Sequence, residues 1–328
     1  MNLSRRFRRL RGTSAIRELV AETRLTPDHL ITPLFLIEGE NKKEAIASMP
    51  GYYRLSLDLL EKEIQELNQL NLWSMLLFVK APDHLKDNEG KEAVNPEGLM
   101  QRAIRKIKSI SPQTLVMTDV ALDPYSIYGH DGIVEDKQIV NDKTVDVLAR
   151  MSISHAMAGA DFVAPSDMMD GRVKAIRDAL DNKGFTQTGI LAYSAKYASC
   201  LYGPFRDALD SAPGFGDKKT YQMDFRNSTE AVKESLQDID EGADMVMVKP
   251  AGAYLDIIQK VKMNVTVPVA AYQVSGEYSM IMAASANGWM DEKQAMLESL
   301  TAIRRAGADV IITYFSKKFA TNFYGNKK

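Results

Sequence analysis

The stretch 241–256, EGADMVMVKPAGAYLD, contains the pattern that decides the fold. Gly242 stands where a left-handed residue would end a helix. The run 243–248 behind it is short, apolar apart from Asp244 and rich in β-formers. A run without polar alternation predicts a strand covered on both faces, as in a parallel sheet. The GAD triplet recurs before apolar runs at 159–161 and 307–309. The chain therefore repeats a unit of helix, glycine turn and buried strand.

Counting outward from this stretch gives eight such runs, separated by helical patterns such as 55–70, 145–158 and 292–306. The runs are 31–37, 73–79, 115–120, 160–164, 189–193, 243–248, 267–273 and 308–314. Eight units predict an α/β fold of the (β/α)8 TIM-barrel type, whose chemistry lies at the carboxyl ends of the strands. A doubly wound open sheet is the alternative, but no glycine-rich phosphate fingerprint follows the first run.

We expect two parts, an N-terminal extension arm over residues 1–29, suited to oligomer contacts, and a catalytic barrel over residues 30–328. The 328 residues are 45% hydrophobic, which is enough to bury a large core. A formal charge of -2 gives no general attraction to nucleic acid or to anionic membranes. A single cysteine excludes a disulfide framework and a zinc site of several thiolates. We therefore predict a cytoplasmic protein with a small-molecule partner, no nucleic acid and no membrane.

Two lysines are the strongest candidates for chemistry. Lys196 and Lys249 follow the fifth and sixth runs, so a barrel places both at the catalytic face. Adjacent strands lie ~4.8 Å apart, which lets two such amines share a pocket. Only about 0.04% of an ordinary lysine is neutral at pH 7, so burial or a second cation has to supply a nucleophilic amine. The alternative for either lysine taken alone is an ion pair with a nearby acid.

A long connection, 194–223, follows the fifth run and has the length of a lid. Arginine and lysine side chains beside aromatic ones suit closure over a substrate carboxylate. The alternative is a surface loop with solvated charges. The candidates in this connection are Tyr202, Phe205, Arg206, Lys218, Lys219 and Gln222.

Other polar residues lie after the remaining runs. Carboxylates and one imidazole follow the third run and suit proton transfer or an oxygen-preferring cation, with turn formation as the alternative. Ser166 and Asp167 follow the fourth run, where either can cap a helix or contact a ligand. Ser275 follows the seventh run at a helix start that suits an anion, and Tyr314 ends the eighth. The candidates after the third run are Asp119, Asp123, His130 and Asp131.

At these residues the chain resembles the porphobilinogen synthase (5-aminolevulinate dehydratase) family. The resemblance runs from RRLRGTSAIRELV to RRAGADVIITYF, and its most specific stretches are APSDMMDGR, YSAKYASCLYGPFRDA, MVMVKPAGAYLDI and QVSGEY. It implies condensation of two 5-aminolevulinate molecules into porphobilinogen, with loss of two waters, in tetrapyrrole (heme) biosynthesis. Lysine Schiff bases carry that reaction.

The resemblance also implies a role for each residue. Lys249 holds the substrate that becomes the propionate side, and Lys196 holds the one that becomes the acetate side. Ser275 and Tyr314 bind the carboxylate of the first. Arg206 and Lys218, with Gln222 nearby, bind that of the second.

The resemblance departs from the zinc-dependent family members at Ala121, Asp123 and Asp131, which stand where those members carry cysteines. It implies no thiolate zinc site, with Asp123 and Asp131 as possible metal ligands. It further implies an allosteric Mg²⁺ at Glu234 and a homo-octamer assembled through the N-terminal arm. A single-lysine class I aldolase of the same barrel type is the alternative enzyme, and a non-catalytic sugar- or acid-binding barrel is a third hypothesis.

Overall fold

The computed structural model describes residues 4–325, so the first three residues of the predicted arm and the last three of the predicted barrel lie outside the described residues. Eight parallel strands form a closed barrel, and the pairing of the last with the first, Ile31 beside Ile312, closes it. This closure confirms the TIM barrel and excludes the open sheet. The barrel strands are β1 (Leu30–Leu36), β4 (Ser74–Val79), β5 (Leu115–Val120), β8 (Phe162–Pro165), β9 (Gly189–Lys196), β10 (Met245–Lys249), β11 (Val269–Gln273) and β12 (Val310–Thr313).

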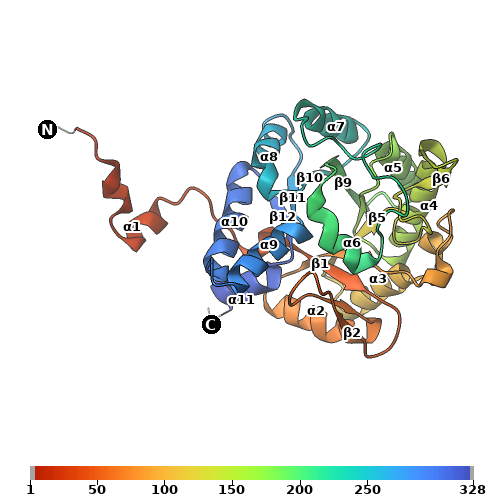
Figure 1. Cartoon of the computed structure of the whole chain (residues 1–328), viewed down its shortest axis with the longest axis horizontal. Helices are drawn as coiled ribbons and strands as arrows, with labels where there is room; N and C mark the ends of the chain where they lie inside the picture. The colour runs from red at the N-terminus through yellow and green to blue at the C-terminus, as the bar shows by residue number, and fades with distance from the viewer. Residues whose placement is uncertain (1–3, 326–328) are drawn as a thin grey trace.

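Helices separate these strands and form the outer ring around the sheet (Figure 1). All eight predicted runs are strands, and Gly159 and Gly307 end their helices with φ of 106° and 119°, as the GAD pattern predicts. The helices are α1 (Ser14–Leu19), α2 (Leu60–Gln69), α3 (Leu99–Ile110), α4 (Asn141–Ala158), α5 (Arg172–Asn182), α6 (Gly203–Leu209), α7 (Thr229–Asp240), α8 (Leu255–Lys262), α9 (Ser275–Ala286), α10 (Glu292–Ala306) and α11 (Ser316–Tyr324).

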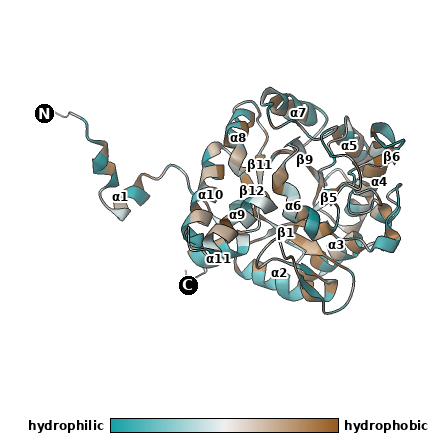
Figure 2. Cartoon of the chain, viewed as in Figure 1, coloured by the Kyte–Doolittle hydropathy of each residue, from teal (hydrophilic) through white to brown (hydrophobic). Residues whose placement is uncertain are grey.

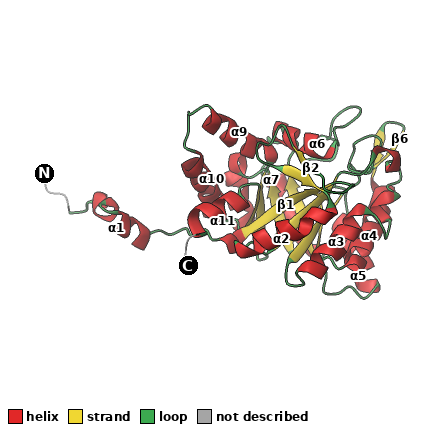
Figure 3. Cartoon of the chain, turned by 90° about the horizontal axis from the view of Figure 1, so that it is seen from below, coloured by secondary structure: helices red, strands yellow, loops and turns green. Residues whose placement is uncertain are grey.

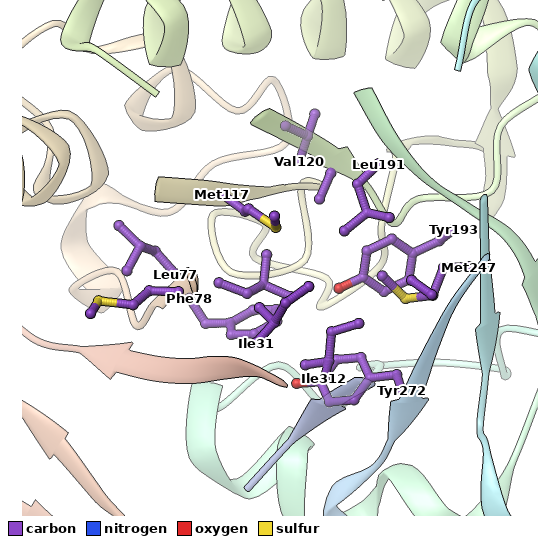
Figure 4. Close-up of a cluster of buried hydrophobic side chains, with 14 of the residues drawn as sticks. Ile31, Leu77, Phe78, Met117, Val120, Leu191, Tyr193, Met247, Tyr272 and Ile312 are labelled. Carbon is purple, nitrogen blue, oxygen red and sulfur yellow. The ribbon is translucent and has the colours of Figure 1, made fainter. Parts of the chain in front are cut away.

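Apolar side chains from all round the sheet fill the barrel interior (Figure 4). Ile31, Phe78, Met117, Leu191 and Met247 come from five different strands and are buried. Figure 2 shows that the outer faces of the surrounding helices are hydrophilic. This interior supports the floor of the catalytic mouth.

Small additional elements decorate the barrel. β2 (Lys43–Ala45) and β3 (Tyr53–Leu55) extend the sheet from β1, and β6 (Ile133–Glu135) and β7 (Gln138–Val140) form a separate hairpin after β5. Short 3-10 turns occupy Phe7–Arg11, Pro27–His29, Leu57–Leu59, Asp83–Leu85, Glu92–Val94, Cys200–Tyr202 and Gly252–Tyr254.

The N-terminal segment with α1 extends away from the barrel (Figures 1 and 3). Its apolar side chains Phe7, Leu10 and Leu19 are 66%, 56% and 80% exposed. The barrel begins at Leu30, the first residue of the predicted barrel domain. None of the helices within residues 4–325 is long and apolar enough to cross a membrane.

Candidate active site

A bulge in β9 brings the two lysines side by side. Val246 of β10 is level with Ala192 of β9, but Val248 is level with Ala195, so β9 carries one extra residue between these pairs. Side chains alternate along a strand, and without the extra residue Lys196 would lie on the opposite face from Tyr193. With it, Lys249 is level with Lys196. The bulge therefore places both amines at the mouth of the barrel.

Lys249 is held among aromatic rings. Its Nζ lies 4.7–5.1 Å from the ring centroids of Tyr193, Tyr202, Phe205 and Tyr272. Over residues 4–325, this amine has neither a hydrogen-bond acceptor nor an ion-pair partner. Burial, followed by the charge of Lys196, lowers the pKa of Lys249 to about 7. The ion-pair interpretation therefore does not apply to Lys249, whose amine is uncharged for a large fraction of the time near pH 7.

Lys196 has a different environment. Its Nζ donates to Asp131 Oδ2 at 3.3 Å and to the carbonyl oxygen of Ser166. Lys218 from the connection after β9 donates to the other oxygen, Asp131 Oδ1, at 2.8 Å, and its Nζ lies 3.6 Å from Asp123 Oδ2. Gln222 donates to Asp131 Oδ2 at 3.5 Å. For Lys196 the ion pair that sequence alone left open is present.

The three aspartates after β5 differ in charge state. Burial raises the pKa of Asp119 to about 7, an effect that Asp123 reinforces and that Ser166, Lys196 and Lys249 oppose. Burial acts the same way on Asp131, but the two neighbouring ammonium groups outweigh it and hold its pKa below the usual range. Asp131 is therefore an ionised anchor, while Asp119 can hold or release a proton near neutral pH.

The connection after β9 lies over the mouth, as Figure 1 shows for α6. The cavity beneath it measures ≈ 20 Å³, about the space of one water. Its lining includes most of the predicted site residues, namely Asp119, Asp123, Asp131, Ser166, Lys196, Tyr202, Phe205, Arg206, Lys218, Gln222 and Lys249. Within the part of the chain that is described, the Arg206 guanidinium has no carboxylate partner, so it is available to a substrate carboxylate.

Ser275 and Tyr314 are nearby but lie outside this cavity. The Ser275 hydroxyl accepts a hydrogen bond from Phe205 N–H at 2.9 Å, so it anchors the lid in this closed arrangement. Tyr314 shares a 2.8 Å hydrogen bond with Tyr272, whose ring faces Lys249. Phe205 of the connection therefore contacts both Ser275, through its N–H, and Lys249, whose Nζ lies 4.9 Å from the Phe205 ring centroid.

Three further candidates have structural partners. His130 contacts Tyr221 Oη and the Phe215 carbonyl, which holds the lid. Asp167 accepts from Met169 N–H and lies 3.8 Å from Arg172. Lys219 is exposed and pairs with Asp217.

Sequence reasoning missed Tyr193 and Tyr272, which supply two of the four rings around Lys249. Both occupy strand positions that alternate with the outward-facing residues. The available signal was an aromatic residue near the carboxyl end of an otherwise aliphatic run, as in GILAY and VAAYQ.

Glu234 lies on α7, away from the lysines. It lines a large open pocket of ≈ 940 Å³ together with Asp170 and Glu230. Burial raises the pKa of Glu234, and the neighbouring carboxylates Asp238, Asp170 and Glu230 add to the effect against the opposing charge of Arg172. A cation would relieve this accumulation of negative charge. Within residues 4–325 these carboxylates do not form a group of three suited to a metal. Mg²⁺ commonly binds through one or two carboxylates and retains several waters, so Glu234 by itself can serve such an ion.

Asp123 and Asp131 do not fit a divalent cation in this arrangement. The oxygens of Asp131 already accept from two lysines, and Lys218 lies between the two carboxylates. No group of three histidine, cysteine, aspartate or glutamate side chains suited to a metal occurs within residues 4–325. We therefore assign no catalytic step to a metal at this position.

A closed parallel barrel whose mouth holds two buried lysines, one of them without an ion-pair partner among residues 4–325, defines a TIM-barrel enzyme of the Schiff-base-forming class. The profile of the delta-aminolevulinic acid dehydratase family matches residues 4–322. The chain belongs to this family and is a lyase with its porphobilinogen synthase activity.

Individual relatives support this assignment. The Chlamydia pneumoniae delta-aminolevulinic acid dehydratase is 52% identical over 96% of this chain and 95% of its own length. The Bacillus subtilis enzyme is 49% identical over 96% and 97%. The crystal structure of the Toxoplasma gondii enzyme, solved with its reaction product porphobilinogen, superimposes with a TM-score of 0.95 at 51% identity, covering 97% of this chain and 91% of that one. These matches favour the synthase over the single-lysine aldolase.

Proposed function

We propose that this chain joins two 5-aminolevulinate molecules while each is held as an imine, one on Lys249 and one on Lys196. The observation that carries the proposal is the pairing of an unpartnered, desolvated amine with a second lysine at the same level of the adjacent strand. To form each imine, the neutral lysine amine adds to the ketone carbon of a substrate, the carbon–nitrogen double bond forms and the ketone oxygen leaves as water. Tethering both substrates in one mouth supplies roughly 7 to 11 kcal/mol through proximity.

We assign roles to the groups around the two lysines from their chemistry. Asp119 holds or moves a proton beside both amines, since its pKa is raised to about 7. Asp131 and the Ser166 carbonyl orient the Lys196 amine. Tyr202 and Phe205 exclude water from Lys249.

Two sets of groups bind the substrate carboxylates in this proposal. Ser275 and Tyr314 take the carboxylate of the substrate on Lys249, and Arg206, Lys218 and Gln222 take that of the substrate on Lys196. The ≈ 20 Å³ cavity is too small for either substrate, so the lid opens to admit them. Opening separates Phe205 from Ser275 and frees its hydroxyl.

The pH dependence of imine formation at Lys249 tests the state of this amine. Raising the pH through about 7 deprotonates Lys249, so the rate of borohydride-trapped adduct should climb from pH 5.5 and level off by about pH 8. An ordinary lysine would instead gain about tenfold per unit up to pH 9. Peptide mapping of the Lys249 adduct across this range measures the rate. A continuous climb to pH 9 would refute the desolvated amine.

We also propose an allosteric Mg²⁺ at Glu234, supported by the pocket lining and the raised pKa of this carboxyl. When bound at Glu234, the ion would supply positive charge in the pocket that Glu230 and Asp170 also line. It takes no part in the chemistry at the lysines, which lie elsewhere.

Chelation followed by metal add-back tests this proposal. Mg²⁺ should restore the activity lost to chelator more than Zn²⁺ does, and Glu234→Ala should weaken the Mg²⁺ response by roughly 10- to 100-fold in apparent affinity. Glu298→Ala, at an exposed position on α10, is the matched control and should respond like the parent. Activity that is indifferent to chelator, or an unchanged Mg²⁺ response in Glu234→Ala, would reject the site.

The remaining proposals concern assembly and location. The exposed apolar side chains of the arm support packing of the arm on a neighbouring copy. We propose that the assembly is a homo-octamer, and sedimentation of the full chain tests this. The basic neighbours of these side chains, Arg5, Arg6, Arg8, Arg9 and Arg11, suit the same contact. A cytoplasmic location stays a prediction from the single cysteine, which cell fractionation can check.

A further inference from the structure

Glu277 is a buried carboxylate that the proposed mechanism does not use. It lies in the first turn of α9, two residues after Ser275, and is only 6% exposed. Three backbone N–H groups donate to it. Gly252 donates to Oε1 at 2.5 Å, while Val274 at 2.7 Å and Ala251 at 3.3 Å donate to Oε2.

These donors come from two different strand ends. Ala251 and Gly252 follow Lys249 at the end of β10, and Val274 precedes Ser275 at the end of β11. One carboxylate therefore joins the segment that carries the Schiff-base lysine to the segment that carries the predicted carboxylate binder. The two oxygens divide these contacts, so an amide, with one acceptor and one donor group, cannot reproduce them.

Burial of this carboxyl group has an energetic cost. Burial raises the pKa of Glu277 to about 7, and the three backbone hydrogen bonds only partly oppose this. A charge placed inside the protein without a cationic partner destabilises the fold unless its hydrogen bonds compensate. A neutral side chain packed between two fixed loops would avoid that cost.

We propose that Glu277 is a positioning residue for the reaction, which fixes the Lys249 segment relative to Ser275 so that the amine and the carboxylate-binding hydroxyl meet one substrate at the correct separation. This inference rests on the proposed role of Lys249. Misplacement of a reacting group by about 1 Å costs on the order of 10²-fold in rate, so loss of the link should appear in catalysis.

Two variants displace the link in different ways. Glu277→Gln removes one acceptor and turns an amide N–H₂ toward backbone donors. Gly252→Ala keeps the carboxylate but adds a Cβ 2.5 Å from Glu277 Oε1. The Glu277 side chain can relieve this clash only by moving away from Gly252. Because Gly252 has no positive φ, the alanine itself causes no backbone strain. Glu298→Gln, on the exposed face of α10, is the matched control.

The experiment measures the rate of borohydride-trapped adduct with 5-aminolevulinate in a Lys196→Ala background, so that Lys249 alone reacts. Rates are divided by the folded fraction from circular dichroism. We expect Glu277→Gln and Gly252→Ala to slow the adduct by about 10- to 100-fold, and Glu298→Gln to match the background protein.

The outcomes separate the two claims. Because loss of Lys196 shifts adduct formation at Lys249 to higher pH, all rates are measured at about pH 9. No adduct in the Lys196→Ala background at this pH means that the proposed role of Lys249 has failed. If the background protein forms the adduct and both test variants form it at the same rate as the background, the positioning role alone is overturned. If Glu277→Gln does not fold, Gly252→Ala decides, and a rate within about twofold of the background contradicts the inference.

Discussion

Replacing Lys249 with methionine will leave a folded barrel that makes no measurable pyrrole from 5-aminolevulinate. Methionine fills the aromatic enclosure of Tyr193, Tyr202, Phe205 and Tyr272 without a charge, but it provides no amine to form the imine. We expect kcat to fall by roughly 10⁴-fold or more, as for loss of other covalent nucleophiles. The measurement is a colorimetric pyrrole assay on purified protein.

Thermal melting accompanies this assay. Removal of a buried, unpartnered amine relieves its desolvation, so Lys249→Met should melt at or above the temperature of the parent. Lys183→Met, at an exposed position after α5, is the matched control and should keep full activity. If Lys249→Met retained more than a few per cent of the parent kcat, the nucleophile would have to be another residue.

Replacing Lys196 with alanine will also abolish pyrrole formation, by at least roughly 10³-fold, yet leave Lys249 able to form its adduct. The second substrate then has no covalent attachment. Asp131 keeps its partner Lys218, which donates at 2.8 Å, so the anchor beneath the lid persists. Loss of the neighbouring cation should also raise the pKa of Lys249 toward its ordinary value, which shifts its adduct formation to higher pH.

This variant separates the synthase from a single-lysine aldolase. In an aldolase Lys196 is only an ion-paired neighbour, and the alanine variant would keep most of its turnover. Retained pyrrole formation in Lys196→Ala would contradict the two-lysine mechanism. Parallel assays of turnover and of the Lys249 adduct distinguish a missing second tether from a damaged fold.

Most of the fold was accessible from sequence because parallel strands buried on both faces leave uninterrupted apolar runs. The run 243–248 and its GAD glycine identify one unit, and the same pattern finds the others. The ends of these runs also indicate where Lys196 and Lys249 lie, since barrel chemistry occurs at one end of the sheet.

The detailed site was less accessible. The bulge between Ala192 and Ala195 turns Lys196 inward. It cannot be predicted from a continuous apolar run, because such a run does not indicate how the strand pairs with its neighbour. The attachment of Lys218 to Asp131 joins segments 87 residues apart, and the lid contact of Phe205 with Ser275 joins segments 70 residues apart. Such pairings depend on the closed tertiary structure.

The most direct test of the two-lysine site is borohydride reduction of the unaltered protein during turnover of 5-aminolevulinate, followed by peptide mapping. We predict substrate-derived mass on the peptides that contain Lys249 and Lys196, with the other lysines unmodified. Adducts absent from both peptides in a protein that makes pyrrole, or confined to another lysine, would contradict the account.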